Sequence, residues 1–404
     1  MANEFISDYD TSSFIDENRI HLSGWCDWTL EKIFGGFGKW DAAYFLKIAE
    51  QGYKYEQYMA FFPFYPWLLR ISARTLHPVL QYFVSERYLL LACGWVLNTV
   101  FFALAAVSLY RLTHGLFRKK NLALVSTLLF CFNPASVFMA SLYTESLFSC
   151  LQFTALCYLE KERLTLAVLL FGVGGATRSN GVISCGFVTH QIIKQFVSNE
   201  VDSLKSTPRL FNLFNLRNAV MASLKLIIFN GIILAPFILF QLYGYVLYCI
   251  PQGDVMGGTA DSPWCDKLIP LPYSYIQDRY WSVGFLRYFE LKQIPNFLLA
   301  TPMILLSSCA VLIYCCNQEN LDIMKSLGLF QRRSKPDNMA RYVKGINLRT
   351  CNCPVHFRSR FIYAIMGGAV VSWAVVRLGL RTLSCVLRQD TFLSQYLSPP
   401  TEGL

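Results

Sequence analysis

The stretch LLLACGWVLNTVFFALAAVSLY, residues 89–110, decides the fold class of this chain. It carries no charged side chain, and a helix needs about 20 mostly apolar residues to cross the hydrocarbon core of a bilayer. We therefore expect this stretch to span a membrane. Comparable apolar runs occupy residues 122–140, 142–159, 223–249, 297–316 and 361–378. Asn133-Pro134 is predicted to break the first of these runs near its non-cytosolic end.

The composition of the whole chain points to the same class. Of its 404 residues, 54% are hydrophobic and only 15% are charged, whereas soluble domains carry about 25% charged residues. This composition excludes soluble, disordered, collagen-like and disulfide-scaffold classes. We expect an all-α polytopic membrane protein that forms a single integral membrane domain over residues 1–404.

A polar interruption separates two shorter apolar runs. Residues 164–176 are rich in glycine, and residues 182–197 follow after Arg178 and Asn180. Broken helices at membrane depth are tolerated where they line a cavity or are buried in protein. We expect two short helices that meet at this break, with a chain that turns back there.

Basic residues gather in four segments, at 111–120, 161–163, 194–225 and 325–360, and the net charge of the chain is +10. Loop 251–296, in contrast, has four Lys and Arg against five Asp and Glu. Cytosolic loops of membrane proteins are enriched in Lys and Arg. The four basic segments are therefore predicted to be cytosolic, and we attribute the positive charge to membrane orientation rather than to nucleic-acid binding.

This orientation divides the chain into five parts. They are a first non-cytosolic loop with a Trp-Asp motif (1–88), a transmembrane bundle (89–250), a non-cytosolic aromatic loop (251–296), further spans with a basic cytosolic loop (297–380) and a tail (381–404).

The first loop contains the sequence KWDAAYF at residues 39–45. A helix is predicted over residues 42–50, with Gly52 as its stop, so that Asp41 lies at the helix start. An aspartate there commonly caps the helix by accepting a backbone N–H bond. The alternative is a catalytic carboxylate beside Trp40, and the spacing alone leaves both interpretations open.

Two charged side chains lie next to apolar runs. Glu145 is a functional candidate because intramembrane carboxylates are costly, although a negative charge at a helix N-terminus is also favoured by the helix dipole. Arg178 could bind phosphate through its planar guanidinium or extend to the membrane interface.

The aromatic loop holds further candidates, among them Trp264, Asp278 and Arg279. Its aromatic side chains suit sugar stacking and a membrane-surface segment equally well. The five histidines show no metal-ligand spacing, and no P-loop, Rossmann, GxSxG or HExxH motif is present. We expect neither a cofactor nor a metal.

Several motifs together resemble one known family. They are Trp40-Asp41-Ala42 with Phe45, Ile48-Ala49-Glu50 and Gly52-Tyr53, then residues 60–63, Asn133-Pro134-Ala135, Arg178-Ser179-Asn180-Gly181, Pro263-Trp264-Cys265 and residues 273–296. In this order, over about residues 24–330, they resemble the GPI mannosyltransferase 2 family, also called phosphatidylinositol glycan class V. Members add the second mannose in GPI-anchor synthesis.

The resemblance implies a GT-C-type multi-span helical bundle with lumenal loops, in the endoplasmic reticulum membrane and with a lumenal active site. It implies transfer of an α-1,6-linked mannose, with inversion, from dolichol-phosphate-mannose to a mannosyl-glucosaminyl-phosphatidylinositol, a GPI glycolipid. Asp41 matches the position of the catalytic base. The expected substrate-binding residues are Trp40, Glu145, Arg178, Asn180, Trp264, Asp278 and Arg279. Besides the donor, the acceptor and membrane lipids, a small membrane subunit is an optional partner.

Two other classes of function are kept as alternatives. A multi-span lipid or sugar transporter or scramblase would use Glu145 and Arg178 to line its pathway. An inactive subunit of a glycosylation complex would share the family motifs without catalysing transfer.

Overall fold

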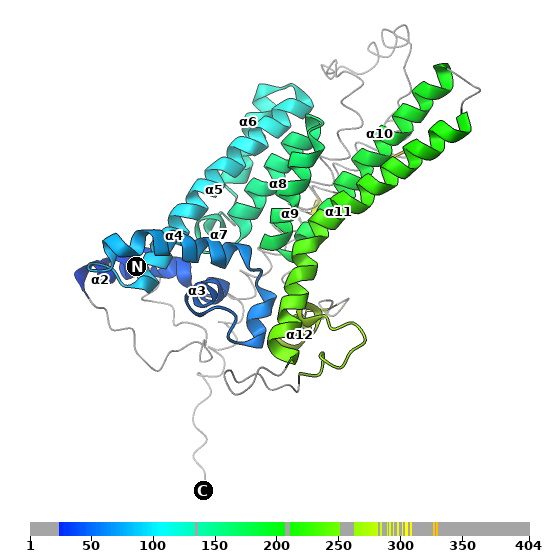
Figure 1. Ribbon diagram of the computed structural model, residues 1–404. Helices are drawn as coiled ribbons and strands as arrows, with labels where there is room; N and C mark the ends of the chain where they lie inside the picture. The colour runs from blue at the N-terminus through cyan, green and yellow to red at the C-terminus, as the bar shows by residue number, and fades with distance from the viewer. Residues whose placement is uncertain are drawn as a thin grey trace.

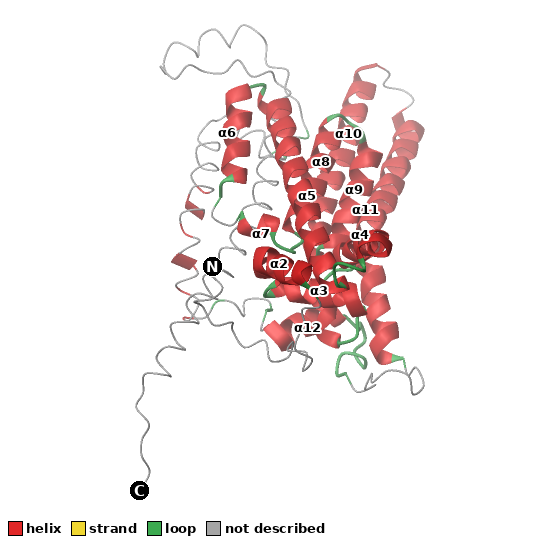
Figure 2. Ribbon diagram, turned by 90° about the vertical axis from the view of Figure 1, so that its left-hand side faces the viewer, coloured by secondary structure: helices red, strands yellow, loops and turns green. Residues whose placement is uncertain are grey.

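The computed structural model describes residues 24–133, 136–206, 211–250 and 262–281, together with scattered positions between 283 and 329. Every regular element in these segments is helical (Figures 1 and 2). The expectation of an all-α protein is therefore confirmed for the part of the chain that the structure describes.

A bundle of long helices forms the body of the molecule (Figure 1). Its members are α5 (Glu86–Phe117), α6 (Lys120–Cys131), α8 (Glu145–Glu160), α9 (Leu164–Thr177), α10 (Cys185–Ser206) and α11 (Phe211–Cys249). Helix α8 packs between α5 and α9, and α11 packs against both α9 and α10.

Two of these helices are long and apolar enough to cross a membrane, judged by length and composition. They are α5 over Glu86–Phe117 and the part of α11 over Leu216–Cys249. Helices α6 and α9 are apolar but shorter. The runs predicted at 89–110 and 223–249 are thus confirmed as helices of spanning length.

The apolar run over residues 122–140 is interrupted where the sequence predicts a break, at Asn133-Pro134. Helix α6 ends at Cys131, and a separate short helix, α7, covers Val137–Ala140. The physical reason is Pro134, which lacks a backbone N–H and disfavours helical backbone in the residue before it. The side chain of that residue, Asn133, donates a hydrogen bond of 2.7 Å to the carbonyl of Phe130.

Several sequence predictions lie outside the described residues. These are the span at 361–378, most of the span at 297–316, most of the basic segment 325–360 and the tail 381–404.

The polar break after α9 reverses the chain, as predicted. The rings of Phe171 in α9 and Phe187 in α10 stack with centroids 6.0 Å apart, whereas a continuous helix would separate these residues by about 24 Å at 1.5 Å per residue. A 3₁₀ segment, η4 (Ser179–Ser184), makes the turn. Its Gly181 lies so close to α9 that an added Cβ would fall 2.5 Å from the backbone of Gly175.

Short helices cover one end of the bundle (Figures 1 and 2). They are α2 (Trp25–Phe34), α3 (Asp41–Gln51), α4 (Phe64–Leu80) and α12 (Pro272–Trp281), with 3₁₀ segments η2 (Gly35–Gly38) and η3 (Glu56–Ala60) between them. A buried cluster that includes Phe45, Tyr65, Leu69 and Leu142 joins α3 and α4 to the bundle. The turn between α5 and α6, the end of α10 and the start of α11 lie at the opposite end.

The close packing at η4 generates a stability prediction. Gly181→Ala should lower the thermal midpoint in detergent strongly, because the new methyl group meets rigid backbone and overpacking typically costs about 1–3 kcal/mol. Gly231→Ala in α11 is the matched control, since a Cβ there meets nothing within 4 Å. Equal midpoints for the two variants would contradict the tight reversal.

Candidate active site

A polar cleft lies where the short helices meet the end of the bundle. Its empty space is about 570 Å³, including open solvent at its mouth. The lining comes from four separate regions of the chain: Asp41, Phe45, Ala60, Phe61, Phe62, Tyr143, Thr144, Glu145, Thr177, Arg178, Ser179, Asn180, Tyr273, Gln277 and Trp281. The structure therefore gathers four of the predicted site residues, Asp41, Glu145, Arg178 and Asn180, around one space.

Asp41 is the first residue of α3, but it is not the residue that caps this helix. The N-cap is Trp40, which makes no side-chain capping bond. Trp40 has φ 58° and ψ −130°, a backbone conformation that costs free energy for a residue with a side chain. Such strain is found preferentially at active sites and ligand-binding sites. Asp41 is therefore the first helical residue rather than the N-cap, and it lines the cleft.

The end of α3 agrees with the sequence prediction. Gly52 stops the helix with φ 79°, and its N–H donates to the carbonyl of Ile48 at 2.9 Å. A positive φ is accessible to glycine without steric penalty.

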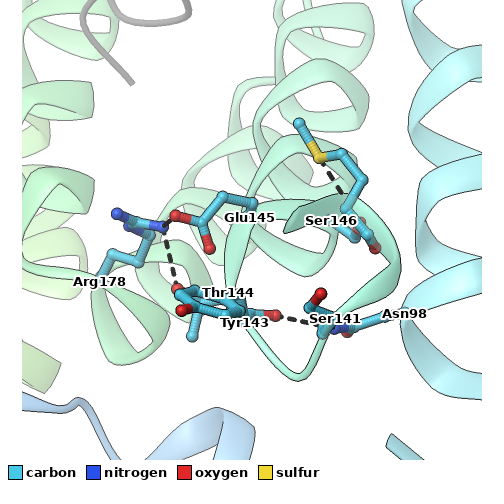
Figure 3. Close-up of polar contacts among 8 residues, drawn as sticks. Asn98, Ser141, Tyr143, Thr144, Glu145, Ser146 and Arg178 are labelled. Carbon is cyan, nitrogen blue, oxygen red and sulfur yellow. Dashed lines mark hydrogen bonds and ion pairs between the residues drawn. The ribbon is translucent and has the colours of Figure 1, made fainter. Parts of the chain in front are cut away.

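Glu145 and Arg178 form a buried ion pair in the cleft (Figure 3). Nη1 of Arg178 contacts Oε1 of Glu145, and the same nitrogen donates a hydrogen bond of 3.1 Å to Oγ1 of Thr144. The Glu145 side chain is only 5% exposed. Both contacts use Nη1, so that Nη2 and Nε of this guanidinium remain oriented for other acceptors.

Asn98 holds the turn that presents Thr144 and Glu145. Its Nδ2 donates to the carbonyls of Ser141 and Tyr143, the second at 3.0 Å (Figure 3). Asn98 is fully buried in α5, where a backbone carbonyl without a donor would be costly. One amide thus fixes the backbone that leads into α8.

Helix α12 closes the cleft with one of its faces. Tyr273, Gln277 and Trp281 line the cleft and follow one another at intervals of four residues, which places them on one side of a helix. The hydroxyl of Tyr273 shares a hydrogen bond of 2.8 Å with Oγ of Ser179. The backbone N–H of Tyr273 donates to Oε1 of Gln241 in α11 at 3.0 Å.

An aromatic wall stands beside Asp41. The ring of Tyr44 stacks on Phe61 with centroids 4.5 Å apart, and both rings lie 5.8 Å from Trp281. Burial, and after it the neighbouring Asp41 carboxylate, raise the pKa of the Tyr44 phenol well above its usual value. Tyr44 therefore stays neutral, and its ring packs against Phe61 and Trp281, which line the cleft.

The other predicted site residues lie outside the cleft lining. Trp40 is 46% exposed and faces the ring of Phe138 at 6.4 Å. Trp264 is fully buried, and its indole N–H donates to Glu56. Asp278 and Arg279 belong to α12 but do not line the cleft.

Sequence reasoning missed Thr144 and Gln277 as site residues, together with one disulfide. The spacing of Tyr273, Gln277 and Trp281 is a signal that could have indicated the helix face. The disulfide joins Cys249 at the end of α11 to Cys265, next to Trp264. Within the described segments, no group of three or more His, Cys, Asp or Glu side chains is placed to hold a metal ion.

The fold and the cleft define a class, that of helical membrane proteins with a polar cleft at one end of the bundle. The family model described as Mannosyltransferase (PIG-V) matches residues 1–394. The chain belongs to this mannosyltransferase family, so the expected family is confirmed.

Individual relatives agree with this assignment. GPI alpha-1,6-mannosyltransferase 2 of Rattus norvegicus is 40% identical over 332 residues, which cover 78% of this chain and 65% of the relative. The Homo sapiens protein of that name is 40% identical over 78% of this chain and 64% of its own length. GPI mannosyltransferase 2 of Schizosaccharomyces pombe is 31% identical over 74% of this chain and 58% of its own length. The matched part of the chain thus covers less than two thirds of each of these relatives, and no solved structure matches significantly.

The role of Asn98 can be tested by stability. Asn98→Ala removes the donor for two buried carbonyls, and each group left unpaired costs about 1–3 kcal/mol. The thermal midpoint in detergent should therefore fall. Thr99→Ala, one residue further along α5, removes only a local hydrogen bond at an exposed position and should leave the midpoint nearly unchanged. An unaltered midpoint in Asn98→Ala would show that this amide does not hold the turn.

Proposed function

We propose that this chain transfers the second mannose of a GPI anchor. The reaction moves a mannosyl group from dolichol-phosphate-mannose to a mannosyl-glucosaminyl-phosphatidylinositol and forms an α-1,6 bond with inversion. The observation that carries this proposal is the meeting of a carboxylate, Asp41, and a cation, Arg178, in one cleft of a mannosyltransferase-family chain.

Inversion requires one displacement at the anomeric carbon. The acceptor hydroxyl oxygen forms the new bond to C1 while the bond from C1 to the phosphate oxygen breaks, and the phosphate leaves with the electron pair. Asp41 is proposed to take the proton of the attacking hydroxyl. General-base assistance of this kind typically contributes about 10²–10⁴-fold to the rate.

Arg178 is proposed to bind the leaving phosphate. Departure converts a phosphate diester into a monoester and adds negative charge, which a fixed cation stabilises more strongly in the transition state than in the ground state. Glu145 and Thr144 hold Nη1 of the guanidinium, so Nη2 and Nε keep one orientation for the phosphate oxygens. Asn180 lines the same side of the cleft and is proposed as a further substrate contact.

Two independent features support a cleft that opens to the lumen of the endoplasmic reticulum. The Cys249–Cys265 disulfide lies at the same end of α11 as α12, and disulfides persist in oxidising compartments such as this lumen. The basic turn after α5 lies at the other end of the bundle, as the enrichment of Lys and Arg in cytosolic loops requires.

The names of the relatives favour mannosyl transfer over the transport of lipids or sugars. The GPI glycolipid acceptor and a small membrane subunit remain proposed partners. An inactive assembly subunit is distinguished from an enzyme by the experiment that follows.

The role of Asp41 is tested in cells that lack GPI mannosyltransferase 2. The wild-type chain should restore GPI-anchored proteins to the cell surface, measured by flow cytometry. Asp41→Asn keeps the size of the side chain but removes its basicity, and should lower mannosyl transfer in membranes by about 10²–10⁴-fold. Asp266→Asn, at an exposed position of the aromatic loop, is the matched control. Full activity of Asp41→Asn would exclude Asp41 as the base.

The redox argument has its own test. Membranes are alkylated before solubilisation, and the protein is digested without a reductant. A peptide pair that links Cys249 to Cys265 should be found, whereas Cys157, which is a free cysteine, should be found alkylated and serves as the control. Reduction should release two separate peptides, identified by mass spectrometry. Recovery of alkylated Cys249 and Cys265 without a reductant would remove the redox support for a lumenal cleft.

A further inference from the structure

Two residues that line the cleft each carry a buried oxygen atom without a hydrogen-bond partner. These atoms are Oε2 of Glu145 and Oε1 of Gln277, and their side chains are 5% and 9% exposed. Figure 3 shows the second carboxylate oxygen of Glu145 turned away from Arg178. Buried polar atoms are nearly always paired, because an unpaired one has lost its water without compensation.

The chemistry of these two atoms limits the ligand that can pair with them. The carboxylate of Glu145, which contacts Arg178, only accepts hydrogen bonds, and the amide oxygen of Gln277 is also an acceptor. The ligand must therefore supply hydroxyl or N–H donors. In the proposed reaction, a phosphate diester and a polyprenol chain offer none, whereas a hexopyranose ring offers several hydroxyl groups.

The surroundings of Gln277 fit a sugar ring. Trp281 lies one helical turn further along α12 and lines the same cleft, with the rings of Phe61 and Tyr44 beside it. Few polar groups among aromatic surfaces are the usual composition of a small-ligand site, where the polar groups decide orientation and specificity.

The surrounding structure positions both residues. The Oε1 atom of Glu145 is tied to Arg178, which determines where Oε2 points. Helix α12, which carries Gln277, is anchored because Glu56 binds both Trp264 before that helix and Tyr280 within it. Preorganised groups of this kind bind a ligand without a large ordering cost.

We propose that Gln277 and Glu145 both accept hydrogen bonds from the hydroxyl groups of one hexopyranose ring in the cleft. This pair of residues thereby selects the sugar by the positions of its hydroxyl groups. This inference rests on the proposed function, in which the donor sugar and the acceptor sugar are both mannose. Either ring offers the same chemistry, so the experiment has to distinguish the two sources.

The test combines a variant with deoxy substrates. Gln277→Met keeps the length of the side chain but removes the acceptor, and Gln277→Glu restores an acceptor. Ser274→Ala, at an exposed position of α12, is the matched control. Each chain is assayed in membranes for kcat and KM with natural substrates, with monodeoxy-mannosyl donors and with acceptors whose terminal mannose lacks one hydroxyl.

The expected result is non-additive. In wild type, the kcat/KM for one particular deoxy analogue should be about 10- to 100-fold lower than for the natural substrate. With natural substrates, the kcat/KM of Gln277→Met should be lower than that of wild type by a similar factor. Gln277→Met should then lose little more with that same analogue, because the interaction is already absent. Gln277→Glu should recover most of the activity, and Ser274→Ala should match wild type. If the sensitive analogue is a deoxy donor substrate, Gln277 and Glu145 bind the mannose that is transferred. If it is a deoxy acceptor substrate, they bind the mannose that receives it.

Several outcomes would overturn the inference. Additive losses for every deoxy analogue would show that Gln277 only supports the fold, and so would a failure of Gln277→Glu to rescue. If Gln277→Met does not fold, the analogue series is run on Gln277→Ala, which also removes the acceptor, and additive losses in that variant would overturn the inference.

A binding measurement separates this inference from the proposed function. If wild type forms no mannosyl product, the proposed function fails, and binding of dolichol-phosphate-mannose and of the acceptor glycolipid is followed by tryptophan fluorescence. If either lipid binds more weakly to Gln277→Met than to Ser274→Ala, the inference that Gln277 binds a sugar hydroxyl group is still supported. Equal binding of both lipids to these two variants would overturn it.

Discussion

The ion pair between Arg178 and Glu145 joins the two chain reversals on which the cleft depends. Glu145 begins α8 after the turn that Asn98 holds, and Arg178 follows directly after α9. A buried charge that loses its partner is strongly destabilising, so the start of α8 and the end of α9 have to lie at the same level. The pair therefore connects two helix ends and also orients a guanidinium toward the cleft.

A second constraint brings the aromatic loop to these helices. Glu56 and Trp264 are 208 positions apart in the chain, yet they share a hydrogen bond, and the Cys249–Cys265 disulfide anchors the same loop to α11. Tyr273 adds contacts to η4 and to α11. These links bring the face of α12 to the cleft that Asp41 also lines, and they complete a cleft that the bundle alone would leave open. The strained backbone at Trp40 directly precedes Asp41.

The sequence was sufficient for much of the helical architecture, because apolar runs and breaks are local properties. It predicted α5, the apolar part of α11, the stop at Gly52 and the reversal at residues 177–181. It also indicated the break at Asn133-Pro134 within residues 122–140, because proline disrupts a helix locally. It could not decide between the two roles of Asp41, because a helix start looks the same whether or not the carboxylate reaches a cleft.

The sequence by itself determined that this chain is helical, that it carries membrane-length apolar runs, and which family it resembles. These conclusions depend on composition, on local spacing and on motifs in a given order. Only the tertiary structure decided which polar side chains meet, because that depends on packing between segments far apart in the chain. It brought together four predicted site residues, Asp41, Glu145, Arg178 and Asn180. It also buried Trp264 as a structural anchor and placed Gln277, which the sequence motifs had not indicated as a site residue, in the cleft.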